Sequence, residues 1–158
     1  MKGEKRKQIN LNLQNDIKDS FSISLLSSHD AMESLCRLKY NQMIIIEDGL
    51  GEISLDDETF KISGKEIFLA AKGQVIRQSY DGKINGYEMS FGDCFWERAP
   101  QSANDCKSIL YNDVTANPNI AINPGPLSSL MDIFNSIYTE YTSPEYINKL
   151  DTMAAYLK

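Results

Sequence analysis

Hydrophobic and polar positions alternate, or form short apolar runs, along the chain from Phe21 to Phe91. A period of two is typical of β-strands, because successive side chains point to opposite faces of a sheet. The runs are separated by residues that favour tight turns, such as Asp48-Gly49 and Asp81-Gly82. The pattern predicts short strands within FSISLL, YNQMIIIEDGLGEISL, ETFKIS, EIFLAA, QVIRQSY and INGYEMSF. Short strands at this close spacing indicate a sandwich or a barrel.

The period changes after a connection rich in Pro and Asn, NPNIAINPGP, at residues 117–126. Apolar residues then recur at steps of three and four, which is the spacing of one face of a helix. A second stripe covers residues 147–157, and Ser143 and Pro144 before it form a helix start signal. We therefore expect two C-terminal helices, the first of which carries Leu127, Leu130, Phe134, Ile137 and Tyr141 on one face.

These patterns divide the 158 residues into three parts. We expect a flexible N-terminal tail over residues 1–15, a β-barrel over residues 16–116, and a linker with a helical segment over residues 117–158. No apolar run is long enough for a membrane span, and no apolar stretch follows the basic start MKGEKRK as it would in a secretory signal. The sequence predicts a cytoplasmic protein without a membrane partner.

Charge and cysteine content narrow the classes of partner. The formal net charge is −6, whereas binding to a phosphate backbone needs clustered Lys and Arg. The three cysteines, Cys36, Cys94 and Cys106, are an odd number without metal-site spacing, which favours free thiols in a reducing compartment. Because of its negative net charge, we expect that this chain does not itself bind DNA.

The sequence contains no recognisable set of catalytic residues. Its one histidine, His29, has no partner in the sequence that would make it a base or a ligand. Cys94 has no histidine near it, and the acidic run at residues 52–58 spans an expected turn, where solvated charge is the ordinary explanation. We expect no enzyme activity and no cofactor.

The order of three segments resembles the N-terminal regulatory domain of AraC-type transcription regulators. The segments are MIIIEDGLGEISLDDETFKI, IFLAAKGQVIRQS and GYEMSFGDCFW. The resemblance implies a fold that is mainly β, a cupin-like barrel of the jelly-roll type followed by two α-helices that dimerise. It also implies that a DNA-binding helix-turn-helix segment would follow beyond Lys158, so that DNA contact would be made only there.

The metal-binding motifs of cupins are not matched in this sequence. Where the first motif would place histidines, the chain has residues 35–38, LCRL, and its glutamate position holds Gln42. With Gly73 as the anchor of the second motif, Ile76 takes the histidine position and Tyr80 the asparagine position. Because imidazole and carboxylate groups bind first-row metals, we expect no metal at this site.

The same alignment predicts which side chains line the interior. If Gln42 and Ile76 point inward, period two also turns Tyr40, Ile44, Gln78 and Tyr80 inward. On the strand INGYEMSF the apolar set is expected inside, namely Tyr87, Met89 and Phe91, with Phe95 or Trp96 sealing one end. A lining of amides, phenols and aliphatic groups suits a small uncharged effector. A packed interior whose polar groups satisfy one another is the alternative. The candidate ligand-binding residues are Tyr40, Gln42, Ile76, Gln78, Tyr80, Tyr87 and Trp96.

The helical stripe has two interpretations. Leu127, Leu130, Phe134, Ile137 and Tyr141 have the spacing of a seam between helices, and the resemblance implies a homodimer through this region. Alternatively, the stripe packs against the barrel. Taken together, the sequence predicts a regulatory, dimerising sensor domain of an AraC-type transcription regulator. A free-standing, metal-independent cupin that binds a small molecule or acts as an isomerase-like enzyme is the alternative.

Overall fold

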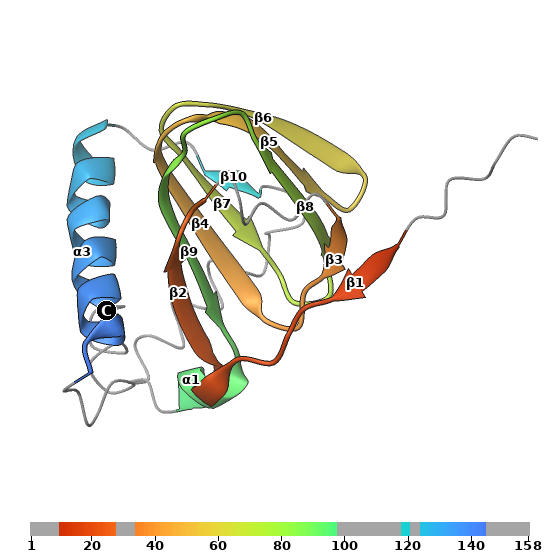
Figure 1. Ribbon diagram of the computed structural model, residues 1–158, viewed down its shortest axis with the longest axis horizontal. Helices are drawn as coiled ribbons and strands as arrows, with labels where there is room; N and C mark the ends of the chain where they lie inside the picture. Colours follow the sequence, from red (N-terminus) through yellow and green to blue (C-terminus); the bar gives the residue numbers. More distant parts are fainter. Residues whose placement is uncertain (1–9, 28–33, 98–117, 121–123, 145–158) are drawn as a thin grey trace, which may run out of the picture.

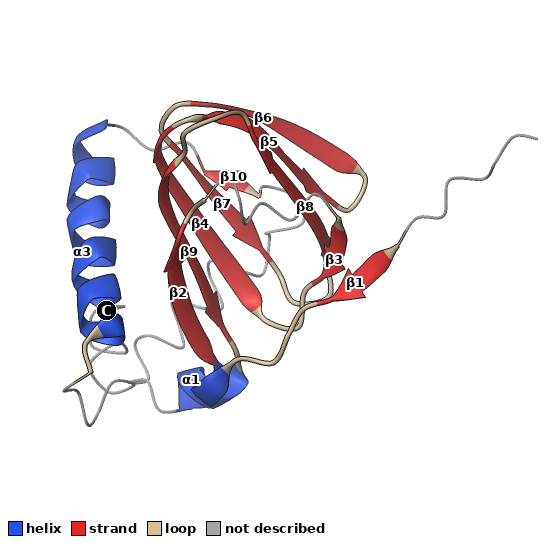
Figure 2. Cartoon of the chain, in the orientation of Figure 1, coloured by secondary structure: helices blue, strands red, loops and turns tan. Residues whose placement is uncertain are grey.

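Two β-sheets face each other, and one long helix lies against the outer face of one of them (Figures 1 and 2). This computed structural model describes residues 10–27, 34–97, 118–120 and 124–144. The β8 sheet contains, in spatial order, β1 (Leu11–Leu13), β3 (Leu35–Arg37), β8 (Val75–Tyr80), β5 (Leu50–Leu55) and β6 (Glu58–Ser63). The β9 sheet contains β10 (Asn119–Ile120), β7 (Glu66–Ala70), β4 (Asn41–Asp48), β9 (Asn85–Phe91) and β2 (Phe21–Leu25).

The strands expected from alternation are confirmed, and they end where the turn signals lie. All pairs are antiparallel except β1 with β3. The short strands β1, β3 and β10 were not expected. Because β1 pairs with β3, residues 11–13 do not belong to a free tail as the sequence had suggested. The helical elements among the described residues are a 3₁₀ turn (Lys18–Ser20), α1 (Asp93–Glu97) and α3 (Pro124–Thr142).

The apolar residues form two separate cores. The first lies between the sheets and is built by inward residues of both, among them Ile44, Ile53, Phe68 and Ile76. The second lies between the outer face of the β9 sheet and α3, with α1 closing one end through Phe95. The β9 sheet is therefore buried on both faces, as its uninterrupted run Met43–Ile46 reflects.

The orientation expected for β9 is wrong. Tyr87, Met89 and Phe91 point away from the space between the sheets and pack in the second core, under α3. Tyr87 donates a hydrogen bond from its hydroxyl to Asn135 Oδ1 at 2.9 Å, and its ring lies 6.2 Å from that of Phe134. The reason is that α3 gives the apolar set of this strand a cover outside the sandwich, so that the polar set faces inward.

Helix α3 confirms the first expected C-terminal helix, and it begins at Pro124, inside the connection expected over residues 117–126. Its stripe packs on its own β9 sheet. Leu127, Phe134 and Ile137 are buried there, and Leu130 and Tyr141 are partly buried against the same core. Leu127, Phe134 and Ile137 are therefore covered within the same chain and are not exposed for a dimer seam. The second expected helix lies outside the described residues.

The outward face of α3 is mainly polar. Its large exposed apolar side chain is Ile133, and its neighbours on this face include Ser129, Asp132 and Ser136. Among the helices that the structure describes, none has the length and hydropathy needed to cross a lipid bilayer.

Candidate ligand-binding site

Polar side chains form a stripe on the inner wall of the sandwich, where β2, β9 and β4 of one sheet face β8 of the other. The strand register places Ser24 of β2 opposite Glu88 of β9, and Gln42 of β4 opposite Ser90 of β9. Side chains of directly paired residues point to the same face of a sheet. Because Gln42 and Ile44 point inward, Glu88 and Ser90 do so as well. Gln78 and Tyr80 approach from β8.

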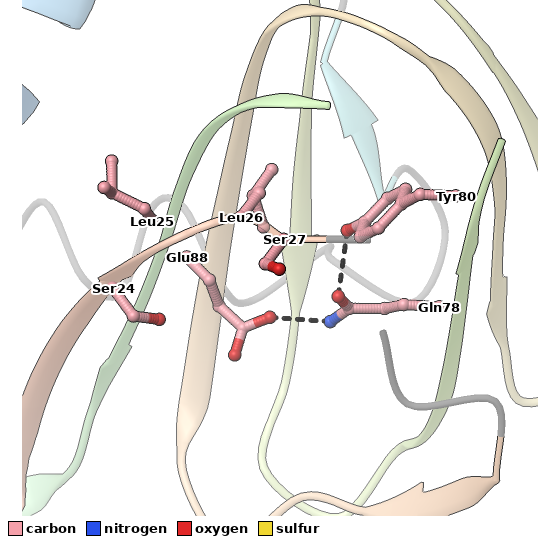
Figure 3. Close-up of a pocket in the computed structure, with 7 residues that line it drawn as sticks. All are labelled: Ser24, Leu25, Leu26, Ser27, Gln78, Tyr80 and Glu88. Carbon is pink, nitrogen blue, oxygen red and sulfur yellow. Dashed lines mark hydrogen bonds between the residues drawn. The ribbon is translucent and has the colours of Figure 1, made fainter. Parts of the chain in front are cut away.

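Glu88 is the centre of a hydrogen-bonded network that joins the two sheets. Its Oε2 accepts a hydrogen bond from Gln78 Nε2 at 2.7 Å, and its Oε1 accepts one from Gln42 Nε2 at 3.1 Å. The Tyr80 hydroxyl donates to Gln78 Oε1 at 2.8 Å. Figure 3 shows this chain of contacts from the Tyr80 hydroxyl through the Gln78 amide to the carboxylate. The Tyr80 bond fixes the Gln78 amide so that its NH₂ group faces Glu88.

Burial raises the pKa of the Glu88 carboxyl, because desolvation disfavours the charged form. The hydrogen bond from Gln78 lowers the pKa and offsets part of this effect. The pKa of the Tyr80 hydroxyl is raised by burial and by the nearby Glu88 charge, and the same two causes raise the pKa of the Cys36 thiol. The Tyr80 phenol is therefore a hydrogen-bond donor at neutral pH, and Cys36 is a thiol.

Two cavities border the Glu88 carboxylate. The smaller has a volume of about 230 Å³ and is lined by the end of β2, by Ser27, and by Gln78, Tyr80 and Glu88. The larger, of about 540 Å³, lies beside the segment of residues 12–17 and is lined by Cys36, Gln42, Glu88 and Ser90 among others. Within the part of the chain that the structure describes, the polar network therefore borders open space on two sides.

The structure brings together four of the seven predicted ligand-binding residues. Gln42, Gln78 and Tyr80 belong to the network, and Ile76 is buried in the core beside it. Tyr40 lies elsewhere, at a separate hollow of about 220 Å³ that is lined by Lys39, Lys72 and Phe91 among others. Its hydroxyl accepts a hydrogen bond from the Ile17 N–H at 3.3 Å. The expectation that Tyr40 joins Gln42 inside fails because it precedes β4, where strand alternation does not hold.

Tyr87 lies on the opposite face of the β9 sheet, and the Trp96 side chain is outside the described residues. Sequence reasoning missed Glu88, the central residue. Alternation had placed it correctly on the face opposite to Tyr87, but the apolar face was assumed to be the inner one. Glu88 could have been identified from the predicted inward position of Gln42 if the β4–β9 register had been known. A single sequence does not contain that register.

The interior does not fit the metal site that many cupin folds carry. Gln42, Ile76 and Tyr80 replace the expected ligands, and an aliphatic side chain and a phenol of raised pKa are poor donors for first-row metals. Within the described ranges, no group of three His, Cys, Asp or Glu side chains is arranged to hold a metal ion. The described residues of the interior therefore do not suit a first-row metal ion.

No family model and no curated protein sequence matches the chain. Among solved structures, ToxT K231A from Vibrio cholerae strain SCE256 is similar, with a TM-score of 0.50 and 13% identity over 90% of this chain and 54% of that one. The Schizosaccharomyces pombe Cnp3 cupin domain has a TM-score of 0.41 and 17% identity over 54% of this chain and 61% of that one. A cupin protein from Bacteroides fragilis has a TM-score of 0.33 and 21% identity, covering 44% and 61%.

At 13% identity, the likeness to ToxT concerns the fold alone. The chain spans about half the length of the ToxT chain that it resembles. The described residues form two facing sheets, with a helix on the outer face of one sheet and a polar stripe on the inner wall. The protein is mostly β, and its fold is similar to that of ToxT.

Proposed function

We propose that this chain is the effector-binding and dimerisation domain of an AraC-type transcription regulator, and that the effector is a small molecule bound between the sheets. The observation that carries the binding part is the network of Glu88, Gln78 and Tyr80 at the border of two cavities. Buried polar groups that pair with one another and also face open space are typical of sites that orient a small ligand.

The regulatory part rests on the sequence motifs that resemble AraC-type regulators. ToxT, an AraC-family regulator, is similar to this chain at the level of the fold. DNA contact would be made by a separate helix-turn-helix segment of the full-length protein, because the formal net charge of −6 opposes binding of this chain to phosphates.

We propose a binder and not an enzyme. Around Glu88 the described groups are amides, hydroxyls, a phenol and a thiol, and the pKa values of the last two are raised. A thiol or phenol that stays protonated is a weak nucleophile and a weak base. The network therefore supplies hydrogen bonds and orientation, which recognition needs.

The dimer is part of the proposal, but its interface must differ from the predicted seam. Leu127, Phe134 and Ile137 are covered by the sheet of the same chain. A homodimer would use other surfaces, and the regulatory proposal needs one because paired DNA half-sites are read by two-fold symmetric proteins. Sedimentation equilibrium at tens of micromolar tests it, and a monomer at that concentration would remove the dimer from the proposal.

A thermal-shift screen of a metabolite library tests the effector site. We expect at least one compound to raise the melting temperature of the wild-type chain and to have no effect on the double variant Gln78→Leu, Tyr80→Phe. The matched control is Arg77→Leu, which changes the neighbouring residue of β8 on its exposed face. Stabilisation that survives in the double variant, or is lost in the control, would place binding outside the interior network.

Transcript profiling tests the regulatory part. The source organism with the encoding gene deleted should show altered levels of a small set of transcripts, and a gene copy with the double variant should fail to restore their response to the effector. An unaltered profile would contradict regulation and would favour the free-standing binder.

A further inference from the structure

The charge that the described residues bring to the two cavities is negative. Among the described residues that line them, Glu88 is the one charged side chain, and the others are serines, amides, Cys36, Tyr80 and aliphatic groups. A carboxylate taken out of water is costly unless an opposite charge or several hydrogen bonds compensate it. The raised pKa of Glu88 shows the same imbalance, since burial outweighs the hydrogen bond from Gln78.

Among the described residues, only half of the hydrogen-bonding capacity of Glu88 is used. An ionised carboxylate offers about four acceptor positions on its two oxygens. The described residues supply two donors, the amide groups of Gln42 and Gln78, one to each oxygen. Both donors are neutral, so the charge itself has no partner of opposite sign among them. The remaining acceptor positions border the cavities.

The orientation of the network reserves these positions for a donor. Because the Tyr80 hydroxyl is donated to Gln78 Oε1, this amide oxygen is engaged and its NH₂ group is directed to Glu88. The smaller cavity is lined by the Glu88 carboxylate, by Ser24 and Ser27, and by Tyr80 (Figure 3). A carboxylate attracts a cation and repels an anion, and the face of a phenol ring attracts cations as well.

From this arrangement we propose that the interior site binds a small organic cation, such as a protonated primary amine, whose N–H groups donate to the Glu88 carboxylate. This inference rests on the proposed effector site and specifies its ligand class. It differs from the uncharged ligand that the sequence suggested, because Glu88 was not then placed inside. At about 30 Å³ per water molecule, the smaller cavity of about 230 Å³ holds roughly eight heavy atoms. A compact amine fits this volume.

Three probes of nearly equal size and different charge test the inference: benzylammonium, benzyl alcohol and benzoate. Their dissociation constants are measured at pH 7 by nuclear magnetic resonance, with the side-chain amide signals of Gln42 and Gln78 reporting binding in the interior. We expect benzylammonium to bind about tenfold more tightly than the alcohol and benzoate to bind least, because charge complementarity separates the three. Glu88→Gln should weaken benzylammonium about tenfold and change the affinity for the alcohol little.

Glu58→Gln is the matched control, since Glu58 is exposed on β6, and it should leave all three affinities unchanged. If Glu88→Gln fails to fold, the carboxyl carbon signal of Glu88 in the wild-type chain serves instead and must shift on adding benzylammonium. If the alcohol or benzoate binds in the interior as tightly as benzylammonium, or more tightly, the proposed preference for a cation is wrong but the effector site is retained. The preference for a cation is also wrong if Glu88→Gln does not change the affinity for benzylammonium. If none of the probes moves the interior amide signals, the effector site itself is overturned.

Discussion

Replacing Gln78 by Leu removes the strongest support of the buried carboxylate. The substitution deletes the 2.7 Å hydrogen bond to Glu88 and the 2.8 Å bond from Tyr80, while it keeps an apolar side chain of similar size in the same place. A hydrogen bond to a charged group contributes about 1.5–3 kcal/mol, and a neutral one about 0.5–1.5 kcal/mol. Since the Tyr80 hydroxyl borders a cavity and can be hydrated there, we expect a net loss of about 2–3 kcal/mol at pH 7.

This loss should depend on pH in a defined direction. The pKa of Glu88 in the folded protein is raised above its ordinary value of 4.5, so its contribution to stability is full below that value and is lost as the pH rises through the folded pKa. Gln78 opposes this loss because its hydrogen bond lowers the folded pKa. Without Gln78 the folded pKa of Glu88 rises further, so ionised Glu88 costs the folded protein more free energy above that pKa. At pH 4, where the folded carboxyl is mostly protonated, we expect the difference between variant and wild type to fall to about 1 kcal/mol.

Urea unfolding followed by circular dichroism at pH 4 and pH 7 measures both differences. Tyr80→Phe is the matched variant, because it removes only the neutral bond and should cost about 0.5–1.5 kcal/mol at both pH values. A loss for Gln78→Leu that is the same at both pH values would show that Glu88 is not the group it supports. A loss below about 0.5 kcal/mol at pH 7 would show that the bond does not form in solution.

Three further predictions concern the core, a close contact and the metal. Ile137→Ala should lower the free energy of unfolding by about 2–5 kcal/mol at every protein concentration, because Ile137 is buried against its own sheet, whereas Ile133→Ala on the outward face should change it by less than about 0.5 kcal/mol. If the loss of unfolding free energy in Ile137→Ala depended on protein concentration, Ile137 would belong to a dimer interface instead. Gly86→Ala should lower the melting temperature strongly, because a β-carbon there would collide with the backbone carbonyl of Ile45, and Gly125→Ala, with open space around it, should not; equal effects would contradict the β4–β9 packing. Elemental analysis after dialysis against a mild chelator should find no stoichiometric zinc, iron, manganese or nickel, and close to one metal per chain would contradict the account of the interior.

Much of the strand order could be predicted from the sequence, because alternation and turn residues are local signals. The pairs Asp48-Gly49 and Asp81-Gly82 mark the ends of strands as expected. The short strands β1, β3 and β10 could not be predicted, since two or three residues carry no period. Their pairing depends on partners far along the chain, such as Cys36 with Ile76.

The sequence alone did not show which face of β9 points toward the other sheet. Alternation correctly separated Tyr87, Met89 and Phe91 from Glu88 and Ser90, but it does not say which set faces the other sheet. The usual assignment of apolar residues to the interior assumes that the outer face meets water. Here α3 covers that outer face, and the resulting second core takes the larger apolar side chains of β9. A carboxylate between the sheets is therefore the part of the site that sequence reasoning could not reach.

Site-resolved titration of the Glu88 carboxyl tests whether a desolvated carboxylate lies on the inner wall of the sandwich and is held by Gln42 and Gln78. The carboxyl carbon signal, assigned with the Glu88→Gln variant, is followed by nuclear magnetic resonance between acid and neutral pH. We expect a midpoint above the ordinary pKa of 4.5, because burial outweighs the hydrogen bond from Gln78. We also expect the midpoint to fall when benzylammonium is added. A midpoint at or below 4.5 in the free protein would mean that Glu88 faces water and is not held in a buried network.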